Sequence, residues 1–184
     1  MRDSTFLRRV VLKNYKSIAA CDVQLGPLTF LVGPNGAGKS NFLDALRFVA
    51  DALRTSLDHA LRDRGGINDV RRRSGGHPTH FGMRLSFSLR SGENGHYAFR
   101  IGSQRGGGYE VQQEECFLYG ASGCHFRVEN GNLISVSSKT APAVSSDRLY
   151  LVNASGLPEF RPLYDAFSNM GFYSLNPDRI RDLQ

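Results

Sequence analysis

The feature that most constrains this sequence is the stretch at residues 33–40, which reads Gly-Pro-Asn-Gly-Ala-Gly-Lys-Ser. It fits the pattern Gly-x-x-x-x-Gly-Lys-Ser/Thr, a glycine-rich loop that wraps phosphate groups. The apolar run at residues 28–32 precedes it, and apolar residues at helical spacing follow it from position 42 to position 57. The sequence therefore predicts a buried strand, a phosphate-binding loop and a helix in direct succession.

Each residue type in this loop has a physical role. Glycine at positions 33, 36 and 38 permits backbone conformations that are closed to residues with a Cβ. Successive N–H groups can then converge on one anion at the positive end of the following helix. Lys39 would reach the β- and γ-phosphates, and the Ser40 hydroxyl would bind Mg²⁺. The alternative is a flexible glycine turn without a ligand, but the flanking strand and helix patterns favour the phosphate site.

Composition indicates one folded domain of an intracellular protein. The chain has 184 residues, of which 40% are hydrophobic, and it contains no run of about 18 apolar residues. Its polar first residues do not resemble a signal peptide, so we expect a cytoplasmic location. The three cysteines are odd in number and predict reduced thiols. A zinc site at Cys116, Cys124 and His125 is a weak alternative, because it is one ligand short of four.

The charge leaves nucleic acid open as a partner. The formal net charge is +6 and the isoelectric point is about 9.5, which permits contact with nucleic acid without requiring it. The densest basic run is Arg71, Arg72 and Arg73, in a loop-like stretch that also carries two acidic residues. A solvated surface loop is favoured over a phosphate contact for this run.

Periodicity divides the chain into three parts. Residues 1–62 predict strands at 6–12 and 18–25, then the phosphate loop and a helix that extends to about residue 61, with Asp44, Arg47, Asp51 and Arg54 on its solvent face. After an irregular loop, residues 81–136 alternate apolar and polar side chains and predict an antiparallel meander. Residues 147–184 predict an α/β return segment: a helix from Pro158 to Gly171, a strand at 172–175 and a helix start at 176–178. The expected strands of the meander lie near residues 81–89, 97–101, 109–119, 124–128 and 132–136.

The order of these segments resembles the N-terminal lobe of an ABC/SMC-type ATPase head. The resemblance is carried by residues 12–18, 26–32 and 33–46, and Asn35 and Asn41 are typical of that class. The nearest groups are the RecF-like and overcoming-lysogenization-defect-like bacterial ATPases of AAA_21 type. This resemblance implies an α/β fold, namely a P-loop NTPase lobe with an antiparallel β meander subdomain.

The resemblance also implies a ligand set and partners. The expected cofactors are ATP and Mg²⁺, with Ser40 as the metal ligand. Related heads form homodimers around two ATP molecules and work in DNA repair, genome maintenance or phage defence, with DNA as a candidate partner. The turn after the first strand lies near the nucleotide in such heads, although a plain surface turn explains its residues equally well. The expected cofactor-binding residues are Gly33, Pro34, Asn35, Gly36, Ala37, Gly38, Lys39, Ser40 and Asn41 in the loop, and Asn14, Lys16 and Ser17 in the turn.

The catalytic acid of such a head is missing from the sequence. A Walker B motif is an apolar run that ends in Asp-Glu, but the run at 149–152 ends in Asn153, and Glu114 and Glu115 follow two glutamines. No catalytic residue is therefore identified, and we expect ATP binding with hardly any hydrolysis until a C-terminal lobe completes the site. The alternative is a nucleic-acid-binding or regulatory P-loop module. A small P-loop kinase is a third, weaker interpretation.

Overall fold

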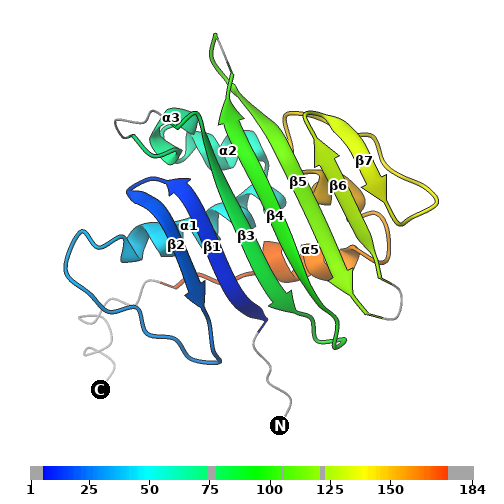
Figure 1. Ribbon diagram of the computed structural model, residues 1–184, viewed down its shortest axis with the longest axis horizontal. Coiled ribbons are helices and arrows are strands. Elements are labelled where there is room, and N and C mark those ends of the chain that lie inside the picture. Colours follow the sequence, from blue (N-terminus) through cyan, green and yellow to red (C-terminus); the bar gives the residue numbers. More distant parts are fainter. Residues whose placement is uncertain (1–5, 74–77, 105, 121–122, 174–184) are drawn as a thin grey trace.

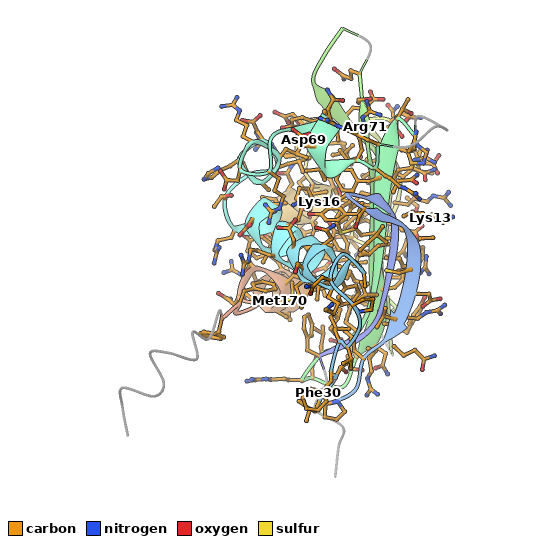
Figure 2. The ribbon with its side chains drawn as sticks, turned by 90° about the vertical axis from the view of Figure 1, so that its left-hand side faces the viewer. Lys13, Lys16, Phe30, Asp69, Arg71 and Met170 are labelled. Atoms are coloured by element: carbon orange, nitrogen blue, oxygen red, sulfur yellow. The ribbon has the colours of Figure 1, made fainter. Side chains whose placement is uncertain are left out.

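A single antiparallel sheet forms the centre of the molecule in the computed structural model, which describes residues 6–73, 78–104, 106–120 and 123–173. The sheet has seven strands in the order β2-β1-β3-β4-β5-β6-β7, and the helices lie on one of its two faces (Figures 1 and 2). The predicted α/β class with an antiparallel meander is confirmed. The strands are β1 (Leu7–Tyr15), β2 (Ile18–Gln24), β3 (His80–Ser88), β4 (Asn94–Ser103), β5 (Tyr109–Tyr119), β6 (His125–Glu129) and β7 (Asn132–Val136). The helices are α1 (Lys39–Arg54), α2 (Leu57–Arg62), α3 (Ile67–Val70), α4 (Tyr150–Ala154) and α5 (Arg161–Ser168).

The strands of the meander form because their side chains alternate. In β3, Phe81, Met83, Leu85 and Phe87 are buried under the helices, while the residues between them face the other side. The expected strands at 109–119 and 132–136 are β5 and β7 themselves, and the other meander strands differ from expectation by a few residues at their ends. The strands β1 and β2 extend this sheet at the β3 edge.

Helix α1 packs across the sheet through a cluster of aromatic rings. Phe48 is fully buried, and its ring lies 5.5 Å from that of Phe81 and 6.2 Å from that of Tyr15. Phe99 adds a fourth ring at 6.4 Å. Because these rings come from α1 and from three strands, the cluster fixes the position of the helix on the sheet. None of the helices in the described ranges is long and apolar enough to cross a membrane.

The predicted helix to residue 61 is wrong in one respect, because it is two helices. Thr55 ends α1 with φ −108° and ψ −87°. Ser56 then accepts a hydrogen bond from the backbone N–H of His59 and caps α2. A serine side chain in this position satisfies an N–H group of the new first turn, so the break is encoded locally. The loop that follows α2 contains the short helix α3.

The buried strand predicted at residues 28–32 is also wrong. The structure places no strand there, and Leu28, Phe30 and Val32 are 74%, 78% and 90% exposed. Figure 2 shows Phe30 at one tip of the molecule. A strand needs a neighbour to pair its backbone groups, and β2 at this edge pairs only with β1 within the described residues.

The C-terminal part differs from expectation as well. Helix α5 covers Arg161–Ser168, so it begins after Pro158 and ends before Gly171. The apolar run at 149–152 lies mostly in helix α4. Phe172 and Tyr173 do not belong to a strand, and the rest of the predicted strand and the helix start at 176–178 lie outside the described residues.

Candidate nucleotide-binding site

The phosphate loop joins the exposed segment at residues 28–32 to the first turn of α1. Gly33, Gly36 and Gly38 have φ values of 155°, 81° and 90°, which residues with a Cβ rarely adopt. A Cβ at position 36 would meet no atom within 4 Å, so this glycine leaves an open approach. The backbone conformations on which the predicted loop depends are therefore present.

The amide groups of the loop are available to a ligand. The N–H of Ala37 donates to the carbonyl of Pro34 at 3.3 Å, and the N–H of Phe42 starts the helical bonds with Gly38. Within the described part of the chain, the N–H groups of Gly36, Lys39 and Ser40 have no acceptor. Unpaired N–H groups at a helix N-terminus attract an anion through their dipoles. Lys39 begins α1, so the N–H groups of Lys39 and Ser40 lie in the first turn of this helix.

Lys39 and Ser40 present the polar groups of the site. The Lys39 ammonium donates to the carbonyl oxygens of Gly33 and Pro34 at 2.7 and 2.8 Å, so the side chain folds back over the loop. The Ser40 side chain is exposed, and its hydroxyl has no partner among the described residues. A free hydroxyl is a suitable ligand for Mg²⁺, which prefers oxygen. The residues present thus fit a magnesium-bound phosphate.

The turn between β1 and β2 lies against the loop. The Asn41 side-chain amide donates to the Ser17 hydroxyl at 2.7 Å, and a Cβ at Gly38 would lie 3.4 Å from the Ile18 side chain. Of the three predicted turn residues, Ser17 therefore contacts the start of α1 directly. The carbonyl of Asn14 accepts a hydrogen bond from the N–H of Arg72 instead. Asn14 has a φ of 54°, so its role in shaping the turn is clear from its backbone.

Lys16 is held by the helix rather than by the loop. Its ammonium lies 2.6 Å from a carboxylate oxygen of Asp44, one turn beyond Ser40 on α1. The same carboxylate accepts hydrogen bonds from the Tyr15 hydroxyl at 2.8 Å and from Arg64 at 3.0 Å. Arg64, whose side chain is only 6% exposed, also binds Asp51 at 3.0 Å. This group, the Arg64 network, ties the β1–β2 turn to the first turns of α1.

The contacts within the Arg64 network favour the ionised form of Asp44 and the neutral form of Tyr15. Burial acts to raise the pKa of Asp44, but its contacts with Lys16, Tyr15 and Arg64 outweigh burial and hold the pKa below its usual value. Burial and the neighbouring Asp44 carboxylate raise the pKa of Tyr15, so its hydroxyl stays protonated and can donate. The helical pattern predicted that Asp44 and Asp51 lie on the solvent face of the helix, but both are partly buried and contact Arg64. Their spacing of seven residues puts them on one face of the helix. This spacing was the feature of the sequence from which a common partner could have been predicted.

The two adjacent acidic residues of β5, Glu114 and Glu115, make structural contacts. Glu114 is buried and accepts hydrogen bonds from the Tyr97 hydroxyl at 2.9 Å and from the N–H of Leu151 at 2.8 Å. It also accepts from the N–H of Tyr150 and so caps α4. Glu115 lies on the opposite face of the sheet and pairs with Arg84 at 2.9 Å. Both carboxylates are engaged within the sheet, so neither is a candidate for the catalytic acid.

Two of the three arginines at positions 71–73 bind groups of their own loop. Arg71 donates to the Asn68 side chain and to the carbonyl of Pro78. Arg73 pairs with Asp69. These contacts agree with a surface loop, which is the interpretation that the sequence favoured over a phosphate contact. Within the described ranges, no group of three or more His, Cys, Asp or Glu side chains could hold a metal ion.

Comparison with known proteins places the loop in a family context. Residues 28–111 match the family model described as "AAA domain, putative AbiEii toxin, Type IV TA system". An OLD nuclease of Thermus scotoductus is 45% identical over 51 residues, which are 28% of this chain and 10% of that protein. The DNA replication and repair protein RecF of Gloeobacter violaceus is 45% identical over 60 residues, covering 32% of this chain and 15% of that protein. The resemblance to ABC/SMC-type P-loop ATPases is confirmed.

Two further comparisons cover more of this chain. Structural maintenance of chromosomes protein 1 of Schizosaccharomyces pombe is 31% identical over 118 residues, covering 59% of this chain and 10% of that protein. A solved structure from work on ATP-driven dimerization and DNA-stimulated activation of SMC ATPases aligns with 97% of this chain and 96% of its own, at 16% identity and a TM-score of 0.47. The matched segments span 10 to 15% of the length of these curated relatives.

Proposed function

We propose that this chain is the ATP-binding lobe of an ABC/SMC-type ATPase and binds Mg–ATP through its Walker A loop. The observation that carries the proposal is the set of unpaired N–H groups at Gly36, Lys39 and Ser40, positioned by glycines with positive φ at the start of α1. Lys39 would leave the carbonyls of Gly33 and Pro34 and turn toward the β- and γ-phosphates. A compact ammonium on a flexible stem suits that movement.

The residues of the site would bind and orient the nucleotide. Ser40 would ligate Mg²⁺, which would neutralise charge on the phosphates when bound. Asn41 would hold the β1–β2 turn beside the loop through Ser17. Asn14, Lys16, Ser17, Pro34, Asn35 and Ala37 belong to this proposed site through their place in the turn or the loop.

Hydrolysis would require a second lobe. The acidic residues of β5 are engaged elsewhere, so a Walker B acid and a signature loop would come from another part of the protein or from a partner. The exposed apolar residues Leu28, Phe30 and Val32 support this, because a large apolar patch beside a binding loop marks an interaction surface. A strand of the second lobe would pair with this segment and cover it.

The names of the relatives support a proposal about the wider role. The name of RecF refers to DNA replication and repair, and the name of the SMC protein refers to the maintenance of chromosomes. We propose that this lobe works in DNA repair, genome maintenance or phage defence, as a homodimer that holds ATP between its heads. Three free cysteines agree with a cytoplasmic location.

Titration with a fluorescent ATP analogue and Mg²⁺ tests the binding step. Lys39→Ala removes the ammonium and is expected to weaken binding at least about tenfold, since a charge-assisted contact is worth about 1.5–3 kcal/mol. Lys139→Ala is the matched control, because Lys139 is exposed and outside any helix or strand. Equal affinity of the parent chain and Lys39→Ala would refute the proposed site.

A further inference from the structure

The helices leave one face of the sheet uncovered. Figure 2 shows α1 on one side of the sheet and Lys13 on the other. This outer face carries the side chains that alternate with the buried ones, among them Arg84 on β3 and Ala98 and Arg100 on β4. No helix of the described ranges packs there, so the side chains of the sheet alone form this surface.

A hollow of about 140 Å³ opens on the outer face, above strands β4, β5 and β6. Ala98 pairs in register with Arg84 on one side and with Glu115 on the other, so the sheet surface is low at this short side chain. A site for one water needs about 10–15 Å³, and the hollow therefore admits a ligand of several non-hydrogen atoms. The side chains around it are Ala98, Arg100, Gln113, Glu115 and Arg127.

Most charged groups around the hollow already have a partner. Glu115 binds Arg84 at 2.9 Å, in a pair that crosses over Ala98. Arg127 binds Glu129 at 2.6 Å. Each pair joins one cation to one carboxylate, so the two pairs together add no net charge to the hollow.

Arg100 is the cation that remains. Its side chain has no acidic partner among the described residues, and its Nε is buried without a hydrogen-bond acceptor. Burial, together with the charges of Arg100 and Lys13, lowers the pKa of His80 on the same face, which agrees with a positive potential here. Because a buried N–H group without an acceptor is unfavourable, a ligand that supplies an oxygen is favoured beside Arg100.

Gln113 adds a second donor at the same place. It pairs in register with Arg100, so the two backbones are about 5 Å apart. Its side chain is exposed and has no hydrogen-bond partner within the part of the chain that the structure describes. A carboxylate has two oxygens that only accept hydrogen bonds, and its plane matches the guanidinium fork. The neighbouring donors of Arg100 and Gln113 suit this group.

We propose that the hollow binds a small free carboxylic acid as its anion, with the carboxylate held by the Arg100 guanidinium and the Gln113 side-chain amide. When the guanidinium turns toward the ligand, its Nε gains the acceptor that it lacks. The inference goes beyond the proposed function, since no residue of the phosphate loop or of the β1–β2 turn takes part.

Charge favours a carboxylate over a phosphate in this hollow. Glu115 and Glu129 lie at its border, and their repulsion of a ligand grows with the charge of that ligand. A carboxylate carries one negative charge, which Arg100 balances, whereas a phosphate group on a hydroxyl carries about −1.5 to −2 at neutral pH. Size sets a further limit, because pockets for drug-sized ligands have about 300–1,000 Å³. The expected ligand is therefore a short-chain acid.

NMR titration of the ¹⁵N-labelled chain with sodium acetate tests the proposal, with sodium chloride at the same ionic strength as the reference. The Nε–H signal of Arg100 and the side-chain amide signals of Gln113 should shift along a saturable curve, with a dissociation constant on the order of 1 mM. Arg100→Gln should weaken binding at least about tenfold, and Gln113→Leu about fivefold. Arg90→Gln is the matched control, because Arg90 is exposed in the turn after β3, and it should change affinity by less than about twofold.

Four results would overturn the proposal: shifts that sodium chloride reproduces, equal acetate affinity of Arg100→Gln and the parent chain, tighter binding of inorganic phosphate, or tighter binding of a glutamate-containing peptide than of acetate. The last result would assign the hollow to a protein side chain instead of a free acid. Circular dichroism melting checks that each variant is folded, and the Arg100 signal of the parent chain decides the question if a variant is not. Arg100→Gln should bind the ATP analogue as the parent chain does, so the two proposed sites fail separately.

Discussion

The sheet with α1 and the segment at residues 28–32 are both rich in apolar side chains, but those of the sheet are buried and most of those in the segment are exposed. In the first region, Phe48, Phe81 and Phe99 bury one another. In the second, Phe30 and Val32 are 78% and 90% exposed. The sheet region finds its partners within the described residues, whereas Phe30 and Val32 are left exposed there. The apolar content of a segment therefore does not by itself decide whether its side chains are buried. Burial also requires a neighbouring element that packs against the segment.

The largest expected effect tests that contrast directly. Phe48→Ala should lower the free energy of unfolding by about 3–5 kcal/mol, since it opens a cavity among three aromatic rings. Phe30→Ser should change it by less than about 0.5 kcal/mol, because the ring is exposed in this chain. Urea denaturation followed by circular dichroism measures both. A large loss in Phe30→Ser would show that the segment is packed and that the contrast is false.

The Arg64 network should come next in size. Arg64→Leu removes the cation that both Asp44 and Asp51 contact, and is expected to cost about 3 kcal/mol because two half-buried carboxylates lose their partner. Arg62→Ala breaks an exposed pair with Asp58 and should cost less than about 0.5 kcal/mol. The same denaturation experiment compares them, and equal losses would show that the Arg64 network does not anchor the turn to α1.

The buried carboxylate of β5 should make stability depend on pH. Burial raises the pKa of Glu114 from 4.5 to about 7, against the opposing effect of its hydrogen-bond donors. The folded state thus binds the proton more tightly than the unfolded state. Its stabilisation is complete below pH 4.5 and is lost as pH rises through 7, at up to about 1.4 kcal/mol per pH unit and about 3 kcal/mol in all.

Glu114→Gln isolates this dependence from that of the histidines. The amide does not ionise, so the free energy of unfolding of the variant should fall less between pH 5 and pH 7.5 than that of the parent chain. Thermal or urea unfolding across this range gives the two slopes. Parallel slopes would mean that Glu114 titrates outside the range.

The smallest effect concerns the contact between the turn and the loop. Asn41→Ala removes the hydrogen bond to Ser17 and should weaken binding of an ATP analogue by a few fold, in line with about 1 kcal/mol for an exposed hydrogen bond. Stability should change little. A calorimetric titration decides the point, and unaltered affinity would remove the β1–β2 turn from the account of the site.

Local patterns predicted much of the fold and of the loop. The alternation in β3 and β5 and the apolar stripe of α1 are dictated by which side chains must be buried, so sequence alone located them. The glycines at 33, 36 and 38 likewise have the positive φ values that the motif requires. These features depend on neighbours within one element or one turn.

The failures depend on distant residues. Helix α4 was not predicted, because the acceptor of the N–H groups of Tyr150 and Leu151 in its first turn is Glu114, more than thirty positions away. Residues 28–32 have a strand pattern without a strand to pair with. The Arg64 network was missed because an arginine in a glycine-rich loop gives no sign of which helix it will contact.

A crystal structure with a non-hydrolysable ATP analogue and Mg²⁺ tests the central claim most directly. The account predicts phosphate oxygens within hydrogen-bond distance of the N–H groups of Gly36, Lys39 and Ser40, and a Lys39 ammonium that has left the carbonyls of Gly33 and Pro34. A loop without nucleotide at saturating analogue, with Lys39 still bound to those carbonyls, would contradict it.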